Sequence, residues 1–270
     1  MKELGWEEGR SYQVLFQWAE GHVERFPALV DELVARHVNV IVALGEPALE
    51  AGRRATATIP IVGIADDMVK MGIAASMNRP GGNATGVSVQ SSELDVKRLE
   101  LLHETLPAAK RIGLLIDPAV LSTRPQLREA ARKLDLALIE VDAPNPKALA
   151  DAFGALASAH LDAVNVLASP LFSTVRHLII ERLNQARLPA IYQFPEAARE
   201  GGLLAYGPSL QAALQQVAAL VAKILRGARP EDLPIENVAK IDFIVNLKTA
   251  KALGIEISPN LLAQADEVIE

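Results

Sequence analysis

Apolar runs of strand length alternate with longer amphipathic stretches along almost the whole chain. The run at 38–44 is apolar at every position except Asn39, which is typical of a strand buried on both faces of its sheet. Such runs, alternating with helical patterns, predict βα units and parallel sheets. The predicted strands are 12–18, 38–44, 59–64, 87–90, 111–116, 137–141, 163–167, 190–193, 203–206 and 241–245.

Helical patterns fill most of the intervals between these strands. Pro47 suits a first helical turn, Ser209 an N-cap, and Gly227 and Gly254 the ends of helices. Pro107 separates two similar series of elements, and 270 residues are enough for two lobes. The predicted helices are 23–36, 47–55, 68–77, 92–105, 124–134, 146–159, 172–186, 209–225 and one that begins at 247.

Composition excludes several classes of function. A net charge of −6 argues against a nucleic-acid partner, which calls for a clustered basic face. The absence of cysteine removes disulfides, thiolate nucleophiles and the usual zinc sites. No uninterrupted apolar run reaches the roughly 18 residues that span a bilayer.

The residues that follow the predicted strands are candidates for ligand binding, because an open parallel sheet binds ligands outside the carboxyl ends of its strands. They combine small or polar side chains with helix starts, whose unpaired N–H groups suit a carboxylate or a phosphate. The alternative is that they only cap helices. The segments that follow strands are 45–47, 65–67, 90–92, 117–118, 168–170, 193–196 and 206–207.

Signs of catalysis are few. The adjacent carboxylates Asp66 and Asp67 would suit Mg²⁺ in a phosphotransfer enzyme, but no accompanying lysine and Ser/Thr are found nearby. No histidine pair has metal-ligand spacing, and no Gly-x-Ser-x-Gly or Gly-x-Gly-x-x-Gly motif occurs. We therefore expect no enzyme activity, no metal and no cofactor. Tyr192, Phe194 and Tyr206 would offer stacking surfaces to a ring-shaped ligand.

Three motifs carry a resemblance to a known family. They are Arg79-Pro-Gly-Gly-Asn-Ala-Thr-Gly86, Gly201-Gly-Leu-Leu-Ala-Tyr-Gly-Pro-Ser209, and the segment from Phe243 to Ile269. In this order, they resemble a family of bacterial ABC-transporter substrate-binding proteins that includes tryptophan- and tyrosine-binding members. The resemblance runs from Leu4 to the end of the chain.

This resemblance implies a type I periplasmic-binding-protein fold, with two Rossmann-like α/β lobes of parallel sheets joined by a hinge. The chain would cross the hinge near Pro107, near Gly202 to Leu204 and near Pro230 to Ile235. The N-terminal lobe would comprise 1–107 and about 204–232. The C-terminal lobe would comprise 108–203 and about 233–270.

The implied function is solute capture for an ABC importer by hinge closure, with an amino acid or similar small carboxylate, aromatic in type, held between the lobes. Implied partners are a permease and an ATPase; the implied location is the periplasm, or a membrane surface through a lipid anchor. The alternatives are the phosphotransfer enzyme and a ligand-sensing domain of the same fold. The predicted ligand-binding residues are Gly45, Glu46, Pro47, Ala48, Asp66, Asp67, Gln90, Ser91, Asp117, Ser169, Tyr192, Phe194 and Tyr206.

The sequence departs from the family pattern where specificity is set. Glu46 stands in place of a small polar residue, Asp117 in place of a frequent asparagine, and Ala168-Ser169 where an acidic residue often occurs. The identity of the ligand therefore does not carry over from the family.

The start of the chain is charged and unlike a secretory signal, whose apolar core has about 7–15 residues. The resemblance implies that a leader and a first βα unit precede Leu4, so the chain is either shortened or read from a late start codon; a natural cytoplasmic protein is the alternative. The first strand would lie between 12–18 and 38–44. We expect a version longer by about 25–30 residues to be more stable, because buried N–H and C=O groups would then be paired.

Overall fold

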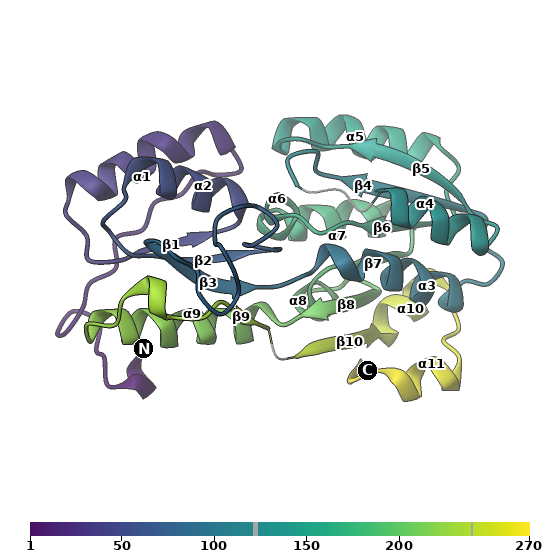
Figure 1. Ribbon diagram of the computed structural model, residues 1–270. Coiled ribbons are helices and arrows are strands. Elements are labelled where there is room, and N and C mark those ends of the chain that lie inside the picture. The colour runs from purple at the N-terminus through teal and green to yellow at the C-terminus, as the bar shows by residue number, and fades with distance from the viewer. Residues whose placement is uncertain (121–123, 239) are drawn as a thin grey trace. The chain divides into compact units, whose positions relative to one another are not determined.

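The computed structural model describes residues 1–120, 124–238 and 240–270, which form two compact units. The first unit comprises 1–90 and 211–239, and the second comprises 91–210 and 240–270. Figure 1 shows their helices and strands. The chain therefore passes between the units after Gln90, after Leu210 and next to residue 239, rather than near Pro107, Gly202 and Pro230.

The first unit is built on a parallel sheet with the strand order β1-β2-β3-β9. Helices α1 and α2 contribute to the apolar core on one face, and α9 covers the other. Alternation along β2 produces the two cores, since Ile61 and Ala65 belong to the first and Val62 and Ile64 to the second. The elements are α1 Phe26–Ala35, β1 Ile41–Leu44, α2 Glu46–Ala55, β2 Ile61–Ala65, β3 Ala84–Ser88, α9 Leu210–Leu225 and β9 Glu236–Asn237.

The second unit is built on a sheet with the strand order β11-β10-β8-β7-β6-β4-β5. All neighbouring strands are parallel except β8 and β10, which are antiparallel. The strands are β4 Arg111–Ile116, β5 Ala137–Asp142, β6 Ala163–Val166, β7 Ala190–Tyr192, β8 Leu204–Pro208, β10 Ile241–Asn246 and β11 Glu267–Ile269.

Helices cover both faces of this second sheet. Side chains of α3, α4, α10 and α11 pack into one apolar core, and those of α5, α6, α7 and α8 pack into the other. These helices are α3 Asp95–Thr105, α4 Arg124–Lys133, α5 Pro146–Ser158, α6 Pro170–Thr174, α7 Arg176–Gln185, α8 Pro195–Arg199, α10 Leu247–Leu253 and α11 Pro259–Gln264. The predicted α/β class with two units is therefore confirmed.

Two glycines allow close packing of the sheet in the first unit. Gly63 of β2 lies beside Gly86 of β3. A Cβ atom on Gly86 would overlap the backbone of Gly63, and one on Gly63 would lie 2.8 Å from the side chain of Leu49. Gly86, the last glycine of the Arg79–Gly86 motif, is thus required because two strands approach each other closely at this position.

Several predicted elements are wrong. Residues 12–18 form no strand, and Phe16 and Trp18 instead stack on each other with each residue 67% exposed. Residues 68–77 form turns rather than a helix, because Gly72 adopts a left-handed conformation that interrupts the helical path. The predicted helix 172–186 is divided at Val175 into α6 and α7.

The helix placed in the first lobe by the sequence, α3, belongs to the second unit. Leu99 and Leu102 of α3 are fully buried in the same core as Leu114 of β4. This packing sets the division between the units at Gln90 rather than near Pro107.

Within the described parts of the chain, every helix is too short or too polar to serve as a transmembrane span.

Strand β1 lies at the edge of its sheet and exposes apolar side chains. Val42 and Leu44 are 47% and 48% exposed, and in the described residues β1 pairs only with β2. We expect the double variant Val42→Thr, Leu44→Thr to self-associate less than the parent, because exposed apolar edge strands pair with other chains. Sedimentation velocity over a concentration series measures this.

The matched control is Ile41→Thr, on the buried face of the same strand. It should lower the melting temperature without reducing association, whereas the double variant should change the free energy of unfolding by only about 0.5 kcal/mol. Unchanged association of the double variant would show that the edge is inert.

Candidate functional site

The carboxyl ends of β1 and β2 bring two buried carboxylates together in the first unit. Gly45 ends β1 in a left-handed conformation with φ 91°, and Glu46 begins α2. The Glu46 Oε1 atom accepts a hydrogen bond of 2.7 Å from the Asp66 N–H, which follows β2. Because parallel pairing sets Leu44 beside Ile64, two residues far apart in sequence meet at one edge of the sheet.

Asp67 and Gln90 complete this edge. The Asp67 Oδ1 atom accepts hydrogen bonds from the N–H groups of Val69 and Lys70, both at 3.0 Å. Its other oxygen lies 3.4 Å from the Lys70 ammonium. Gln90 has φ 46° and donates its N–H to the Asp66 carbonyl at 3.0 Å. Asp67 therefore caps a turn, while Gln90 and Glu46 both fix the backbone of Asp66.

The acidic side chains of this edge are engaged by groups of the protein itself. In the described ranges, no group of three or more histidine and acidic side chains is placed to hold a metal ion. The Asp67 carboxylate is engaged by two N–H groups and a lysine.

The carboxyl ends of β4, β6 and β7 form a second cluster, in the second unit. The Ser169 hydroxyl donates a hydrogen bond of 2.6 Å to Asp117 Oδ2 and accepts one of 3.2 Å from the Phe172 N–H. The Gln193 side-chain amide bonds both the N–H and the carbonyl of Ser169, each at 2.8 Å. The Ala119 N–H donates to the other Asp117 oxygen at 2.9 Å. All three side chains of the cluster are buried.

Local sequence explains the position of Ser169 in this cluster. Ser169 has extended backbone angles and caps α6, with Pro170 in the first turn. The rest depends on the sheet, because β6 lies between β4 and β7 and brings Asp117 and Gln193 to either side of Ser169. We call Asp117, Ser169 and Gln193 the serine cluster.

Arg98 lies behind these strand ends and was not among the predicted site residues. It is fully buried, and its guanidinium forms an ion pair of 2.5 Å with Asp95 one turn earlier on α3. It also donates to the carbonyls of Ser91, Gln193 and Tyr206. The spacing of Asp95 and Arg98 is visible in the sequence, but such pairs are common on solvated helix faces, and only the burial distinguishes this one.

The aromatic candidates lie in different environments. Tyr192 is buried in the apolar core among α7 and α8, and burial raises the pKa of its phenol because the phenolate would be desolvated. Phe194 and Tyr206 are half-buried, and Tyr206 makes an edge-to-face contact with Phe243 at 6.2 Å. Tyr192 therefore supports the strand ends from within the core, while Phe194 and Tyr206 retain partial exposure.

The remaining predicted residues lie at two places, the start of α2 in the first unit and the region of Arg98 in the second. Pro47 and Ala48 are in the first turn of α2, next to Glu46. Ser91 is buried, and its hydroxyl accepts a hydrogen bond of 2.8 Å from Arg98.

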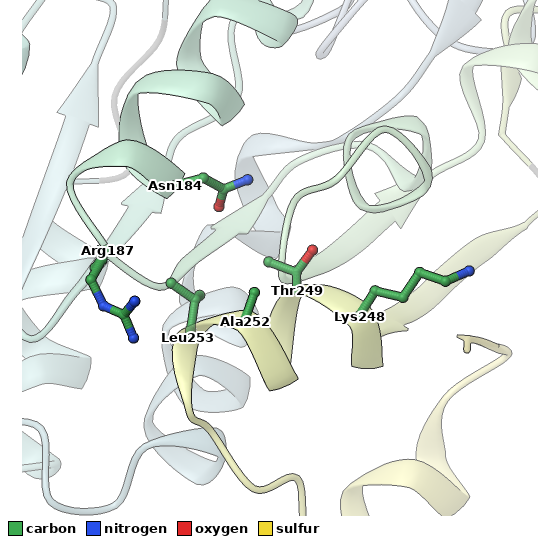
Figure 2. Close-up of a pocket in the computed structure, with 6 residues that line it drawn as sticks. All are labelled: Asn184, Arg187, Lys248, Thr249, Ala252 and Leu253. Atoms are coloured by element: carbon green, nitrogen blue, oxygen red, sulfur yellow. The ribbon is translucent and has the colours of Figure 1, made fainter.

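A surface hollow of about 360 Å³ lies elsewhere on the second unit and contains none of the predicted residues. Figure 2 shows Asn184 and Arg187 on one side, and Lys248, Thr249, Ala252 and Leu253 of α10 on the other. Arg187 precedes β7, so the hollow adjoins the amino ends of the parallel strands, opposite the serine cluster.

Comparison with known proteins matches both the fold and almost the whole length of the chain. The family described as ABC transporter substrate binding protein matches residues 1–269, and the chain belongs to this family. Its structural neighbours are periplasmic solute-binding proteins of the type I fold.

Three relatives illustrate the similarity. The tyrosine-binding protein of Clostridioides difficile is 25% identical over 260 residues, which are 95% of this chain and 74% of that protein. A conserved domain protein of Vibrio cholerae has a TM-score of 0.88 and 28% identity, with 99% of this chain and 90% of that chain covered. A Streptococcus pneumoniae ABC domain in complex with L-Trp has a TM-score of 0.86 and 23% identity, over 99% and 91% of the two chains.

The serine cluster should contribute measurably to stability. Ser169→Ala removes the donor to Asp117 and the acceptor for Phe172. We expect a loss of about 1–3 kcal/mol in the free energy of unfolding, because buried polar groups are left unsatisfied. Urea denaturation measures this.

Ser173→Ala is the control, since Ser173 is half-buried one turn further along the same helix. A loss from Ser169→Ala no greater than that from Ser173→Ala would show that the hydroxyl contributes nothing.

Proposed function

We propose that this chain is the solute-binding component of an ABC importer and that its ligand is an amino acid with an aromatic side chain. Membership of the substrate-binding family supports the first part. The second part is supported by two relatives described as a tyrosine-binding protein and a complex with L-Trp. The serine cluster is the observation in this chain that carries the proposal.

The ammonium group of the amino acid matches the acidic strand ends. Glu46 and Asp66 in the first unit and Asp117 in the second are buried carboxylates. A cationic group beside a buried carboxylate makes a charge-assisted hydrogen bond, which is about twice as strong as a neutral one. These carboxylates would not favour a ligand that carries a carboxylate and no cationic group.

The carboxylate of the ligand matches the start of α2. Gly45 precedes this ten-residue helix and has no side chain to cap it. The amino end of a helix favours an anion through the helix dipole and its first-turn N–H groups. Pro47, in the first turn, contributes no N–H.

An aromatic side chain of the ligand would be accommodated by rings that are already held in place. Tyr206 is fixed by its edge-to-face contact with Phe243, and Phe194 follows the serine cluster residue Gln193. Both retain partial exposure, so each offers apolar surface to a second ring at centroid distances of about 4.5–7 Å.

Transport would follow from a ligand that binds one conformation of the protein more tightly than another. A ligand shifts a conformational equilibrium only by its differential affinity for the two states. An amino acid that binds one conformation more tightly favours that conformation. The closed, liganded form would then be recognised by a permease with its ATPase, outside the cytoplasm.

Isothermal titration calorimetry tests the proposal. We expect L-tryptophan or L-tyrosine to bind, and 3-indolepropionate, which lacks the ammonium group, to bind at least about tenfold more weakly. Asp117→Asn should weaken amino-acid binding by a similar factor, because asparagine still accepts the Ser169 hydrogen bond but removes the charge.

Asp135→Asn is the matched control, because Asp135 is exposed next to the amino end of β5. Its affinity for the amino acid should equal that of the parent. Absence of heat with all twenty amino acids would refute the proposed ligand class, and equal binding of 3-indolepropionate would refute the role of the carboxylates.

A further inference from the structure

We propose that Arg98 is a positioning residue for ligand binding: one buried guanidinium holds three backbone segments of the second unit that carry the proposed aromatic contacts or support Asp117. The inference rests on the proposed function for the identity of the ligand. The contacts of Arg98 with the three segments do not depend on it. Arg98 itself contacts no ligand in this proposal and acts through the carbonyl of Gln193.

Hydrogen bonds from Arg98 reach three separate segments. Its Nη1 atom donates to the Ser91 carbonyl at 2.9 Å and to Asp95 at 2.5 Å. Its Nη2 atom donates to the Ser91 hydroxyl at 2.8 Å and to the Gln193 carbonyl at 3.3 Å. Its Nε atom donates to the Tyr206 carbonyl at 2.6 Å. Each nitrogen of the planar fork therefore has an acceptor.

These contacts connect Arg98 to the serine cluster. The Gln193 residue whose carbonyl Arg98 holds also bonds the backbone of Ser169 through its side-chain amide. Ser169 in turn donates to Asp117. A continuous series of hydrogen bonds thus runs from α3 through the end of β7 to the carboxylate after β4.

Arg98 also holds the segments by which the chain enters and leaves the second unit. Ser91 is the first residue of that unit. Tyr206 is in β8, from which the chain passes into α9 and the first unit after Leu210. The same guanidinium that orients Gln193 therefore fixes two of the connecting segments within the second unit.

Gly207 supplies an independent observation for the same arrangement. A Cβ atom at this position would overlap the Gln193 carbonyl oxygen and would lie 3.0 Å from Nη2 of Arg98. Residue 207 must therefore lack a side chain for the Gln193 carbonyl and the guanidinium to approach each other. The glycine and the arginine act on one atom, the Gln193 carbonyl oxygen.

Lysine does not reproduce this geometry. Arginine presents five N–H donors in a rigid plane, whereas an ammonium group is a single point at the end of a flexible stem. Arg98→Lys keeps a positive charge for Asp95, and so avoids leaving that carboxylate buried alone, but it cannot reach Ser91, Gln193 and Tyr206 together.

The first measurement compares Arg98→Lys with a control of similar thermal stability. Leu127→Ala is suitable, since Leu127 is a fully buried residue of α4 that belongs to neither the serine cluster nor its hydrogen bonds. We expect Arg98→Lys to weaken L-tryptophan or L-tyrosine binding by about tenfold or more and Leu127→Ala to leave the dissociation constant unchanged. Equal dissociation constants for the two variants would contradict the positioning role and show that Arg98 contributes only to stability.

The second measurement needs no ligand. Amide hydrogen exchange of Arg98→Lys should increase at 91–93, 193–194 and 206–207, while 137–142 in β5 keeps the protection of the parent. Unchanged exchange in all three segments would overturn the inference. If the parent binds no amino acid while these segments exchange faster, the proposed function fails and the positioning role stands.

A double-mutant cycle with Gly207→Ala tests whether both residues act on the same atom. We expect Gly207→Ala alone to weaken binding, and the double variant Arg98→Lys, Gly207→Ala to lose little more than the larger single loss. Additive losses would show that the two residues influence binding separately, which contradicts the shared role of the Gln193 carbonyl.

Discussion

The buried ion pair of Arg98 with Asp95 is the interaction on which the ligand-facing edge of the second unit depends. A charged guanidinium removed from water persists only if its charge is balanced and its donors are paired. Asp95 balances the charge, and the carbonyls of Ser91, Gln193 and Tyr206 take the remaining donors. The cost of burying Arg98 therefore forces the ends of β7 and β8 and the start of α3 into one arrangement.

A further hydrogen bond attaches the same edge to the sheet. The Asn165 amide, in the middle of β6, donates to the Asp95 carbonyl at 3.2 Å. The first turn of α3 is thus attached to the central strands of the sheet. Gln193 and Ser169 are consequently held by a rigid frame, which favours affinity because little conformational freedom is lost on binding.

In the first unit, a buried charged side chain is likewise paired, here with a backbone N–H group. Glu46 is buried, and the N–H of Asp66 on the neighbouring strand supplies one of its hydrogen bonds. The carboxylates of this edge lie where two parallel strands end side by side, and the close contact of Gly63 with Gly86 sets the spacing of the next pair. The acidic edge of this unit is thus fixed by the pairing of its own strands.

Sequence alone determined the alternation of strands and helices, because burial on both faces leaves runs such as 163–167, which can be recognised without knowing their neighbours. The run 38–44 was also recognised as a strand, although β1 proves to be exposed on one face. Sequence also placed Asp66, Asp117 and Ser169 at strand ends. It did not identify Arg98, because a charged residue on a helix is usually solvated. It placed Gln193 in a strand-end segment but did not predict its buried hydrogen bonds to Ser169. Only the tertiary structure decided that α3 packs in the second unit, that 12–18 pairs with no strand, and that Gly207 leaves room for a guanidinium. Each of these depends on which segments meet in space, and the local pattern of apolar and polar residues does not specify those neighbours.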